Sequence, residues 1–404
     1  MTSRTALPGR ARCAAAAAAL LLLAACNSGR PPPPFEQAAS EATDDLVSQT
    51  QKLPAFLAKI QNSLVKPTAS GPKSGIVIDP MLDSTTGEQT VATTAFEQRV
   101  IKRMAARFEQ FEFLPFQAAN LSRAQYLLTG TMTRVPSQPA RKVVRLNLAL
   151  TDLKSGSVVA QASALAREDG IDNTPLRYYK DSPVLMKDKV IEGYTRTTAT
   201  PPGQKADTYY MERIAAATYI SEATSLYNAE RYQEALGTYR NVLTTPEGEQ
   251  LRTLSGVYLA SVKLGKVADA EKAFAKVVAL GFAYNEIGVK FLFNPGSVDF
   301  WSDPKISNAY AMWLRQIARE SVNANACLNI VGHTSHSGPE PINDALSLKR
   351  AAYIRQRLAG EAPSLGPRTT ATGMGFRQNI VGSGTDNSFD ALDRRVEFKI
   401  VPCP

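Results

Sequence analysis

The last quarter of the chain, residues 289–403, sets the strictest limits on the fold. A strand-like apolar run, 328–333, ends in Gly332-His333-Thr334-Ser335, and a loop with Gly338 and Pro339 follows it. A short apolar run bounded by small and polar residues is typical of a buried strand. The segment therefore predicts a strand whose carboxyl end leads into a polar loop.

A helix is predicted directly after this loop, over residues 344–358. Asn343 stands where a helix N-cap is expected, and Gly360 can close the helix. Arg350 lies one turn after Leu346, on or beside the apolar stripe. The stripe itself is built from residues at helical spacing, namely Ala345, Leu346, Tyr353, Ile354 and Leu358. A Gly373-Met374-Gly375 turn and an alternating final strand, 393–400, complete the segment.

In their order and spacing these residues resemble the OmpA-like peptidoglycan-binding domain. That family runs through a GHTD turn, an Asn, an LSxxRA helix, a GxG turn and an NRRVE strand. The corresponding residues here are Gly332-His333-Thr334-Ser335, Asn343, Leu346-Ser347-Leu348-Lys349-Arg350-Ala351, Gly373/Gly375 and Arg394-Arg395-Val396-Glu397. The resemblance implies a βαβαββ domain over residues 286–404. Residues 291–300 would be its entry strand and loop, and 306–317 its first helix.

The resemblance also implies a ligand, the diaminopimelate of the peptidoglycan stem peptide. Arg350 would bind a carboxylate of this amino acid as a two-pronged fork. The family's Asp, which meets the amine, is replaced here by Ser335, and a hydroxyl brings no opposite charge. The implied binding residues are Arg350, Ser335, Asn343, Thr334, Leu346 and Arg395.

Each of these residues also has a purely structural interpretation. Arg350 could be a solvated helix arginine, and Asn343 only a helix cap. Arg394 and Arg395 alternate on the predicted strand, so one could reach the ligand while the other forms a surface salt bridge. His333, at the end of its strand, is interpreted as a packing or hydrogen-bonding residue.

The first 25 residues have the pattern of a targeting segment. Arg4, Arg10 and Arg12 precede an apolar stretch, 14–25, which is too short to span a bilayer. The stretch ends in Leu23-Ala24-Ala25-Cys26, which is similar to the bacterial lipobox. That similarity implies removal of residues 1–25 and acylation of Cys26 with palmitate-like chains, which anchor stably when two or more are present. Asn27 in place of Asp favours the periplasmic face of the outer membrane; the alternative is an ordinary secretory signal.

The cysteines favour an exported protein with one disulfide. Cys13 leaves with the leader and Cys26 is the lipidation site, which leaves Cys327 and Cys403. An isolated pair in an exported chain favours a disulfide between them. With only two histidines, the chain lacks any metal-ligand spacing, so neither a metal nor another cofactor is expected.

Composition and pattern divide the rest of the chain into four parts. Residues 26–70 are a polyproline tether and a helix-rich segment, and 71–166 read as alternating strands and helices that end in a hairpin. Within the second part, the runs 126–132 and 148–152 resemble the α/β lipoprotein domains of the CsgG, LpoB and FlgO kind. Residues 167–210, poor in periodicity and rich in proline, are predicted to be a linker.

Residues 211–285 read as two helical hairpins. Val267, Ala270, Phe274 and Val277 repeat Tyr232, Ala235, Tyr239 and Val242 after 35 residues, close to the tetratricopeptide period of 34. Such repeats offer a concave groove for a partner, or serve as a spacer between domains. The predicted fold class is thus an α+β multidomain chain with an N-terminal α/β domain, central helical hairpins and a C-terminal βαβαββ domain.

The functional prediction is a non-enzymatic outer-membrane lipoprotein. It would bind peptidoglycan through the C-terminal domain and recruit an envelope protein through the helical repeats or the α/β domain. The alternative is a structural subunit of a secretion or surface-organelle assembly. A net charge of +9, dispersed along the chain, does not favour nucleic-acid binding. No Ser-His-Asp, HExxH or Cys-His arrangement points to catalysis.

Overall fold

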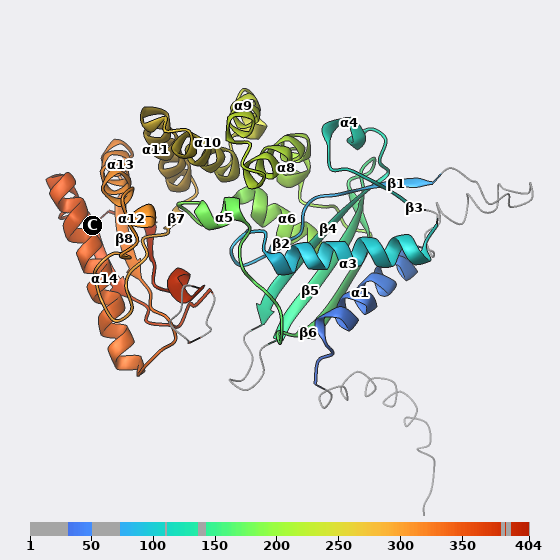
Figure 1. The fold of residues 1–404 in the computed structure, drawn as a ribbon, viewed down its shortest axis with the longest axis horizontal. Helices are drawn as coiled ribbons and strands as arrows, with labels where there is room; N and C mark the ends of the chain where they lie inside the picture. The colour runs from blue at the N-terminus through green and yellow to red at the C-terminus, as the bar shows by residue number, and fades with distance from the viewer. Residues whose placement is uncertain are drawn as a thin grey trace, which may run out of the picture.

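The computed structural model describes residues 31–50, 73–109, 111–135, 143–380, 384 and 389–403. It contains an N-terminal sheet covered by helices, a central set of helices and a C-terminal sheet flanked by helices (Figure 1). The predicted fold class is therefore confirmed. The leader, Cys26 and the apolar positions between 53 and 64 lie outside the described residues.

The N-terminal sheet combines a parallel half with an antiparallel half. Its strand order is β3-β1-β4-β5-β6, and the short β2 also pairs with β4. β3, β1 and β4 run parallel, whereas β4, β5 and β6 form an antiparallel meander. The strands are β1 (Ser74–Ile78), β2 (Leu82–Asp83), β3 (Phe111–Leu114), β4 (Tyr126–Val135), β5 (Val143–Asp152) and β6 (Ser157–Arg167).

Both faces of this sheet are covered. Helices α1 (Phe35–Thr50) and α3 (Val91–Arg107) pack on one face, and they are joined by Asp44 of α1, which pairs with Arg103 and Arg107 of α3. The short α4 (Ala118–Leu121) lies between β3 and β4. The first seven residues of β4 are buried without alternation, as expected for a strand covered on both sides.

The segment predicted to be a linker contains helices that the sequence pattern did not indicate. α5 (Arg177–Asp181), α6 (Lys189–Ala199) and α7 (Thr208–Met211) all lie within residues 167–210. Asp188 caps α6 by accepting hydrogen bonds from the Val190 and Ile191 amides. α6 buries its apolar side on the second face of the N-terminal sheet. α5 and α7, of five and four residues, carry too few turns for a periodic signal to be recognised.

Asp79, directly after β1, is buried where α6 and α7 cover the end of the strand. Its Oδ2 accepts a hydrogen bond of 2.7 Å from the hydroxyl of Tyr210. Burial raises the pKa of Asp79 to about 6, although Arg252 and Tyr210 act in the opposite direction. The folded state therefore holds this proton more tightly than the unfolded chain does.

We expect Asp79→Asn to stabilise the protein above pH 7 and to change little near pH 3.5. Because the folded pKa is raised, the stability due to Asp79 is complete below its unfolded pKa, about 3.9, and is lost as the pH rises through about 6. The variant should gain roughly 2–3 kcal/mol at pH 7.5. Thermal midpoints at the two pH values measure this, with the exposed Asp169→Asn as a control. An equal gain in stability at both pH values would contradict a raised pKa of Asp79 in the folded state.

The central helices form two antiparallel hairpins. They are α8 (Ile214–Asn228) with α9 (Tyr232–Val242), and α10 (Leu251–Lys263) with α11 (Val267–Ala283), joined through the 3-10 turn η1 (Pro246–Gly248). Residues 251–261 of α10 are all buried. Tyr178 of α5 donates its hydroxyl proton to the carbonyl of Arg252, and α11 packs on the C-terminal domain. Other segments of the chain thus pack on both α10 and α11.

The C-terminal domain has the predicted βαβαββ order. Its sheet runs β7-β10-β8-β9, with β8 and β9 parallel and β10 antiparallel to both of its neighbours. The elements are β7 (Glu286–Val289), α12 (Pro304–Ser307), α13 (Tyr310–Asn323), β8 (Cys327–Gly332), α14 (Glu340–Glu361), the 3-10 turn η2 (Pro363–Leu365), β9 (Thr369–Gly373), the 3-10 turn η3 (Phe389–Asp393) and β10 (Val396–Val401).

Several predicted boundaries in this domain were wrong. α14 starts at Glu340, so Asn343 lies inside the helix and does not cap it. The helix continues past Gly360 to Glu361. Ala345 is exposed and lies off the buried stripe. The first helix divides into α12 and α13, and the final strand begins at Val396, after both arginines.

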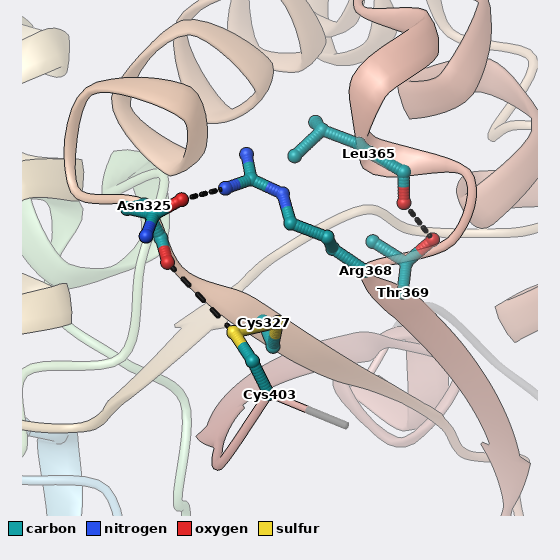
Figure 2. The surroundings of a disulfide bond; sticks show 6 residues. All are labelled: Asn325, Cys327, Leu365, Arg368, Thr369 and Cys403. Carbon is teal, nitrogen blue, oxygen red and sulfur yellow. Dashed lines mark hydrogen bonds between the residues drawn. A yellow bond between two sulfur atoms is a disulfide. The ribbon is translucent and has the colours of Figure 1, made fainter.

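A disulfide joins Cys327 at the start of β8 to Cys403 at the end of the chain (Figure 2). The Cα atoms are 5.2 Å apart, next to the last pair of the β8–β10 ladder, Cys327 and Val401. Nearby, Arg368 donates a hydrogen bond to the side chain of Asn325. The bond closes a loop over a sequence separation of 76, which restricts the unfolded chain and so favours the fold.

A buried ion pair connects the N-terminal and C-terminal domains. Nζ of Lys290, just after β7, lies 2.7 Å from Oε1 of Glu88 and also donates to the carbonyl of Tyr179 at 2.8 Å. Beside it, Val184 of the predicted linker pairs antiparallel with Val289 at the edge of the C-terminal sheet. The C-terminal domain therefore completes its sheet and its charge pairing with residues from earlier in the chain.

Candidate functional site

The residues singled out from the sequence meet where β8, α14 and β10 come together. Gly332 makes this approach close, because a Cβ there would lie 2.0 Å from the carbonyl oxygen of Ser347 on α14. Gly373 on β9 faces the same helix turn, with the Ser347 hydroxyl 2.6 Å from its missing Cβ. These glycines let α14 lie directly on the sheet, and so bring its polar first turns beside Thr334 and Ser335.

The structure buries almost the whole predicted set. Thr334, Ser335, Asn343, Arg350 and Arg395 are each no more than 4% exposed, and Leu346 is half-buried. Asn343 uses its amide to donate to the carbonyls of Ser337, Gly338 and Pro339, so it holds the loop before the helix. The Ser335 and Ser337 hydroxyls lie 3.4 Å apart in the same loop.

Arg350 is fully buried, and its guanidinium binds backbone carbonyls. Its nitrogens donate to Ser297 O at 3.0 Å, His333 O at 3.1 Å and Asn294 O at 3.0 Å. The guanidinium carbon lies 5.1 Å from the centre of the Phe293 ring. Arg350 thus joins the entry loop to the end of β8. A ligand carboxylate can reach it only if residues 294–297 move.

A second charged group lies at the start of β10. Arg395 pairs with Glu397 at 2.6 Å, and Nε2 of His333 lies 3.4 Å from the other oxygen of the same carboxylate. Burial acts to raise the pKa of Glu397, but His333 and Arg395 outweigh it and lower the pKa to about 2. Burial also lowers the pKa of His333. At neutral pH the Glu397 carboxylate is therefore ionised and paired with Arg395.

The buried polar atoms at this site that lack a hydrogen-bond partner among the described residues include the Thr334 hydroxyl, Nη1 of Arg395 and Nδ1 of His333. Buried polar atoms are nearly always hydrogen-bonded, so an exception indicates a binding or catalytic position, or a water. A hydroxyl and a guanidinium N–H are both suited to an oxyanion such as a carboxylate.

The loop after β9 forms one wall of the site and was not recognised in the sequence. Asn379 spans it: with its amide oriented so that both polar atoms are satisfied, it donates to Thr334 O at 2.8 Å and accepts from the His336 amide at 3.0 Å. Arg395 donates to Gln378 O, and the Ile380 amide donates to the Asp393 carboxylate. A single asparagine in a loop gives no periodic or motif signal, so sequence reasoning could not find it.

The described part of the chain holds neither a metal site nor a membrane-spanning helix. No group of three or more His, Cys, Asp or Glu side chains there is placed to hold a metal ion. Nor does any helix within those residues combine the length and apolar character needed to cross a membrane.

No known protein-family model matches the chain, and no curated protein matches it either. Solved structures are similar over its C-terminal part. The peptidoglycan-associated lipoprotein from Burkholderia pseudomallei is 22% identical, over 30% of this chain and 92% of its own, with a TM-score of 0.24.

Two further structures show the same extent of similarity. The cell wall anchor of the T6SS from Pseudomonas aeruginosa is 20% identical, over 28% of this chain and 79% of its own, with a TM-score of 0.23. The periplasmic domain of Helicobacter pylori MotB is 15% identical, over 30% of this chain and 76% of its own, also with a TM-score of 0.23. The similarity thus concerns less than a third of the chain.

Proposed function

We propose that this chain is a non-enzymatic cell-envelope protein that binds the peptidoglycan stem peptide through its C-terminal domain. The observation that carries the proposal is the pair of buried, unpartnered donors, the Thr334 hydroxyl and Nη1 of Arg395. Thr334 directly precedes Ser335, and the backbone carbonyl of Arg395 accepts a hydrogen bond from the His333 amide, so both residues flank the turn at which the motif order places the ligand. A free amino-acid end such as that of diaminopimelate offers the carboxylate that these donors fit.

The two arginines have different roles in this proposal. Arg395 offers the unpartnered N–H, while Arg350 lies beneath the site and binds the carbonyl of His333. Arg350 thereby orients the turn that carries Thr334 and Ser335 and adds positive charge behind it. Contact of the ligand with Arg350 itself follows only after the entry loop has moved.

Attachment to the outer membrane is the second part of the proposal. It is supported by the run Leu23-Ala24-Ala25-Cys26, with Cys26 as the acylated residue. The lipid end would lie in the membrane and the C-terminal domain on the wall, so that the chain connects two layers. Because α10 is covered by the chain's own residues, a protein partner would contact the outer helices or the N-terminal domain.

Ser335→Asp is expected to strengthen binding about tenfold. A carboxylate at this position restores an opposite charge for the ligand amine, and a charge-assisted hydrogen bond contributes roughly 1.5–3 kcal/mol. Binding is measured by co-sedimentation of the full chain with purified peptidoglycan sacculi. The full chain is needed because Lys290 of the C-terminal domain is buried against Glu88.

Ser337→Asp is the matched control, since it places the same charge two residues along the same loop. It should not increase the bound fraction. Equal gains for both variants would indicate a general charge effect, and no effect of Ser335→Asp would place the ligand amine elsewhere. If the wild-type chain does not sediment with sacculi, the proposal fails and the structural-subunit alternative takes its place.

A further inference from the structure

The candidate site is closed in this structure, and the loop that closes it can be identified. The five polar site residues are at most 4% exposed. The loop 375–380 lies against them, since Asn379 binds the backbone at Thr334 and His336, and Gln378 accepts from Arg395. The Thr334 amide donates to Gly375 O at 2.9 Å. A stem peptide can enter only when this loop moves away.

The same loop is held from outside by the N-terminal domain. Nη1 of Arg134, near the end of β4, donates a hydrogen bond to the carbonyl of Ile380. Nε and Nη2 of Arg134 both donate to one carboxylate oxygen of Glu168, one residue beyond β6. The Glu168 side chain is largely buried, which orients the guanidinium toward the loop.

We propose that Arg134 is a latch through which the N-terminal domain controls access to the site. The latch rests on the proposed function and describes how that function would be regulated. Arg134 and Glu168 belong to the antiparallel half of the N-terminal sheet, and Ile380 belongs to the site loop. A partner that displaced Arg134 from Ile380 would free the loop. Wall binding and partner binding at the N-terminal domain would then be coupled, and each would favour the other.

The described Arg134–Ile380 hydrogen bond sets the minimum size of the effect. When a ligand binds only to molecules whose loop is open, its apparent dissociation constant equals the intrinsic constant divided by the fraction of molecules with an open loop. One hydrogen bond contributes a net factor of about 2 to 10 to such an equilibrium. Arg134→Ala should therefore raise the apparent affinity for a diaminopimelate muropeptide about two- to tenfold.

The test compares the full-length wild type, Arg134→Ala, and the control Arg145→Ala, an exposed arginine on the neighbouring strand β5. Amide hydrogen exchange without ligand is followed at Thr334, His336 and Ile380, and muropeptide binding by calorimetry. The latch predicts faster exchange and tighter binding for Arg134→Ala alone. Unchanged exchange would overturn it, whether or not the muropeptide binds.

Amide exchange tests the latch, and muropeptide binding tests the proposed function, so the two can fail separately. Faster exchange with no muropeptide binding by any variant would support the latch and refute the assigned ligand. Faster exchange with weaker binding would overturn the latch, because Arg134 would then align the site for its ligand. Glu168→Gln, which keeps the shape of the side chain but removes its charge, should change exchange in the same direction as Arg134→Ala.

Discussion

Replacing Glu88 by Gln is expected to cost about 3–5 kcal/mol of unfolding free energy. The ammonium of Lys290 would remain buried, bonded only to the carbonyl of Tyr179 and the uncharged amide. A buried charge that loses its partner keeps its full desolvation cost, which is why the expected loss is large. Because the pair joins the two domains, the loss should appear in the unfolding of both. Urea unfolding measures it when it is followed by far-UV circular dichroism, which reports both domains, and by the fluorescence of Trp301 and Trp313, which reports the C-terminal domain.

The double variant Glu88→Gln/Lys290→Met should recover most of this loss. Burial raises the pKa of Glu88 in spite of Lys290, and replacing both members of a buried ion pair by uncharged residues is often neutral or stabilising. The exposed pair Arg240–Asp269 is the control, and Asp269→Asn should cost less than about 1 kcal/mol. If Glu88→Gln cost no more than this control, the two domains would not depend on the pair.

Arg350→Ala should destabilise the C-terminal domain by about 3–5 kcal/mol, before any question of ligand binding. The change leaves the carbonyls of Asn294, Ser297 and His333 without their donor, and it opens a cavity beside the Phe293 ring. Each orphaned buried acceptor costs roughly 1–3 kcal/mol, reduced where water can enter. The thermal midpoint of the full chain measures the loss.

Lys349→Ala is the control for this variant, since Lys349 is the exposed neighbour on α14. It should change the thermal midpoint little. A fall for Arg350→Ala that is no larger than for Lys349→Ala would mean that the carbonyl contacts contribute little. Arg350 would then be available to a ligand carboxylate at small cost.

The sequence predicted the strands and long helices well, because each carries a periodic signal. The hairpin of β5 and β6 alternates with period two, and the repeats of α8 to α11 recur after 35 residues. The last domain was predicted from its motif order and its glycines. Gly332 illustrates why this worked, since only a residue without a Cβ fits 2.0 Å from Ser347 O.

The remaining features depend on contacts between distant segments, which a single sequence does not contain. Arg350 was expected to face a ligand. In the structure it binds three carbonyls from two loops that precede it in the sequence. α6 was missed although its buried residues recur at helical spacing, because the prolines of residues 167–210 favoured a linker. Arg134 and Asn379 gain their roles only when the two domains meet. Motifs thus located the site, whereas tertiary contacts determine which of its atoms remain free.

Calorimetric titration of the full chain with a diaminopimelate-containing muropeptide tests the central claim most directly. A muropeptide with lysine in place of diaminopimelate is the matched control, because it lacks only the side-chain carboxylate. The proposed site predicts saturable binding of the first peptide and binding at least about tenfold weaker for the second, since a charge-assisted contact is lost. Equal binding of the two peptides, or binding of neither, would contradict the claim that this domain recognises the wall peptide.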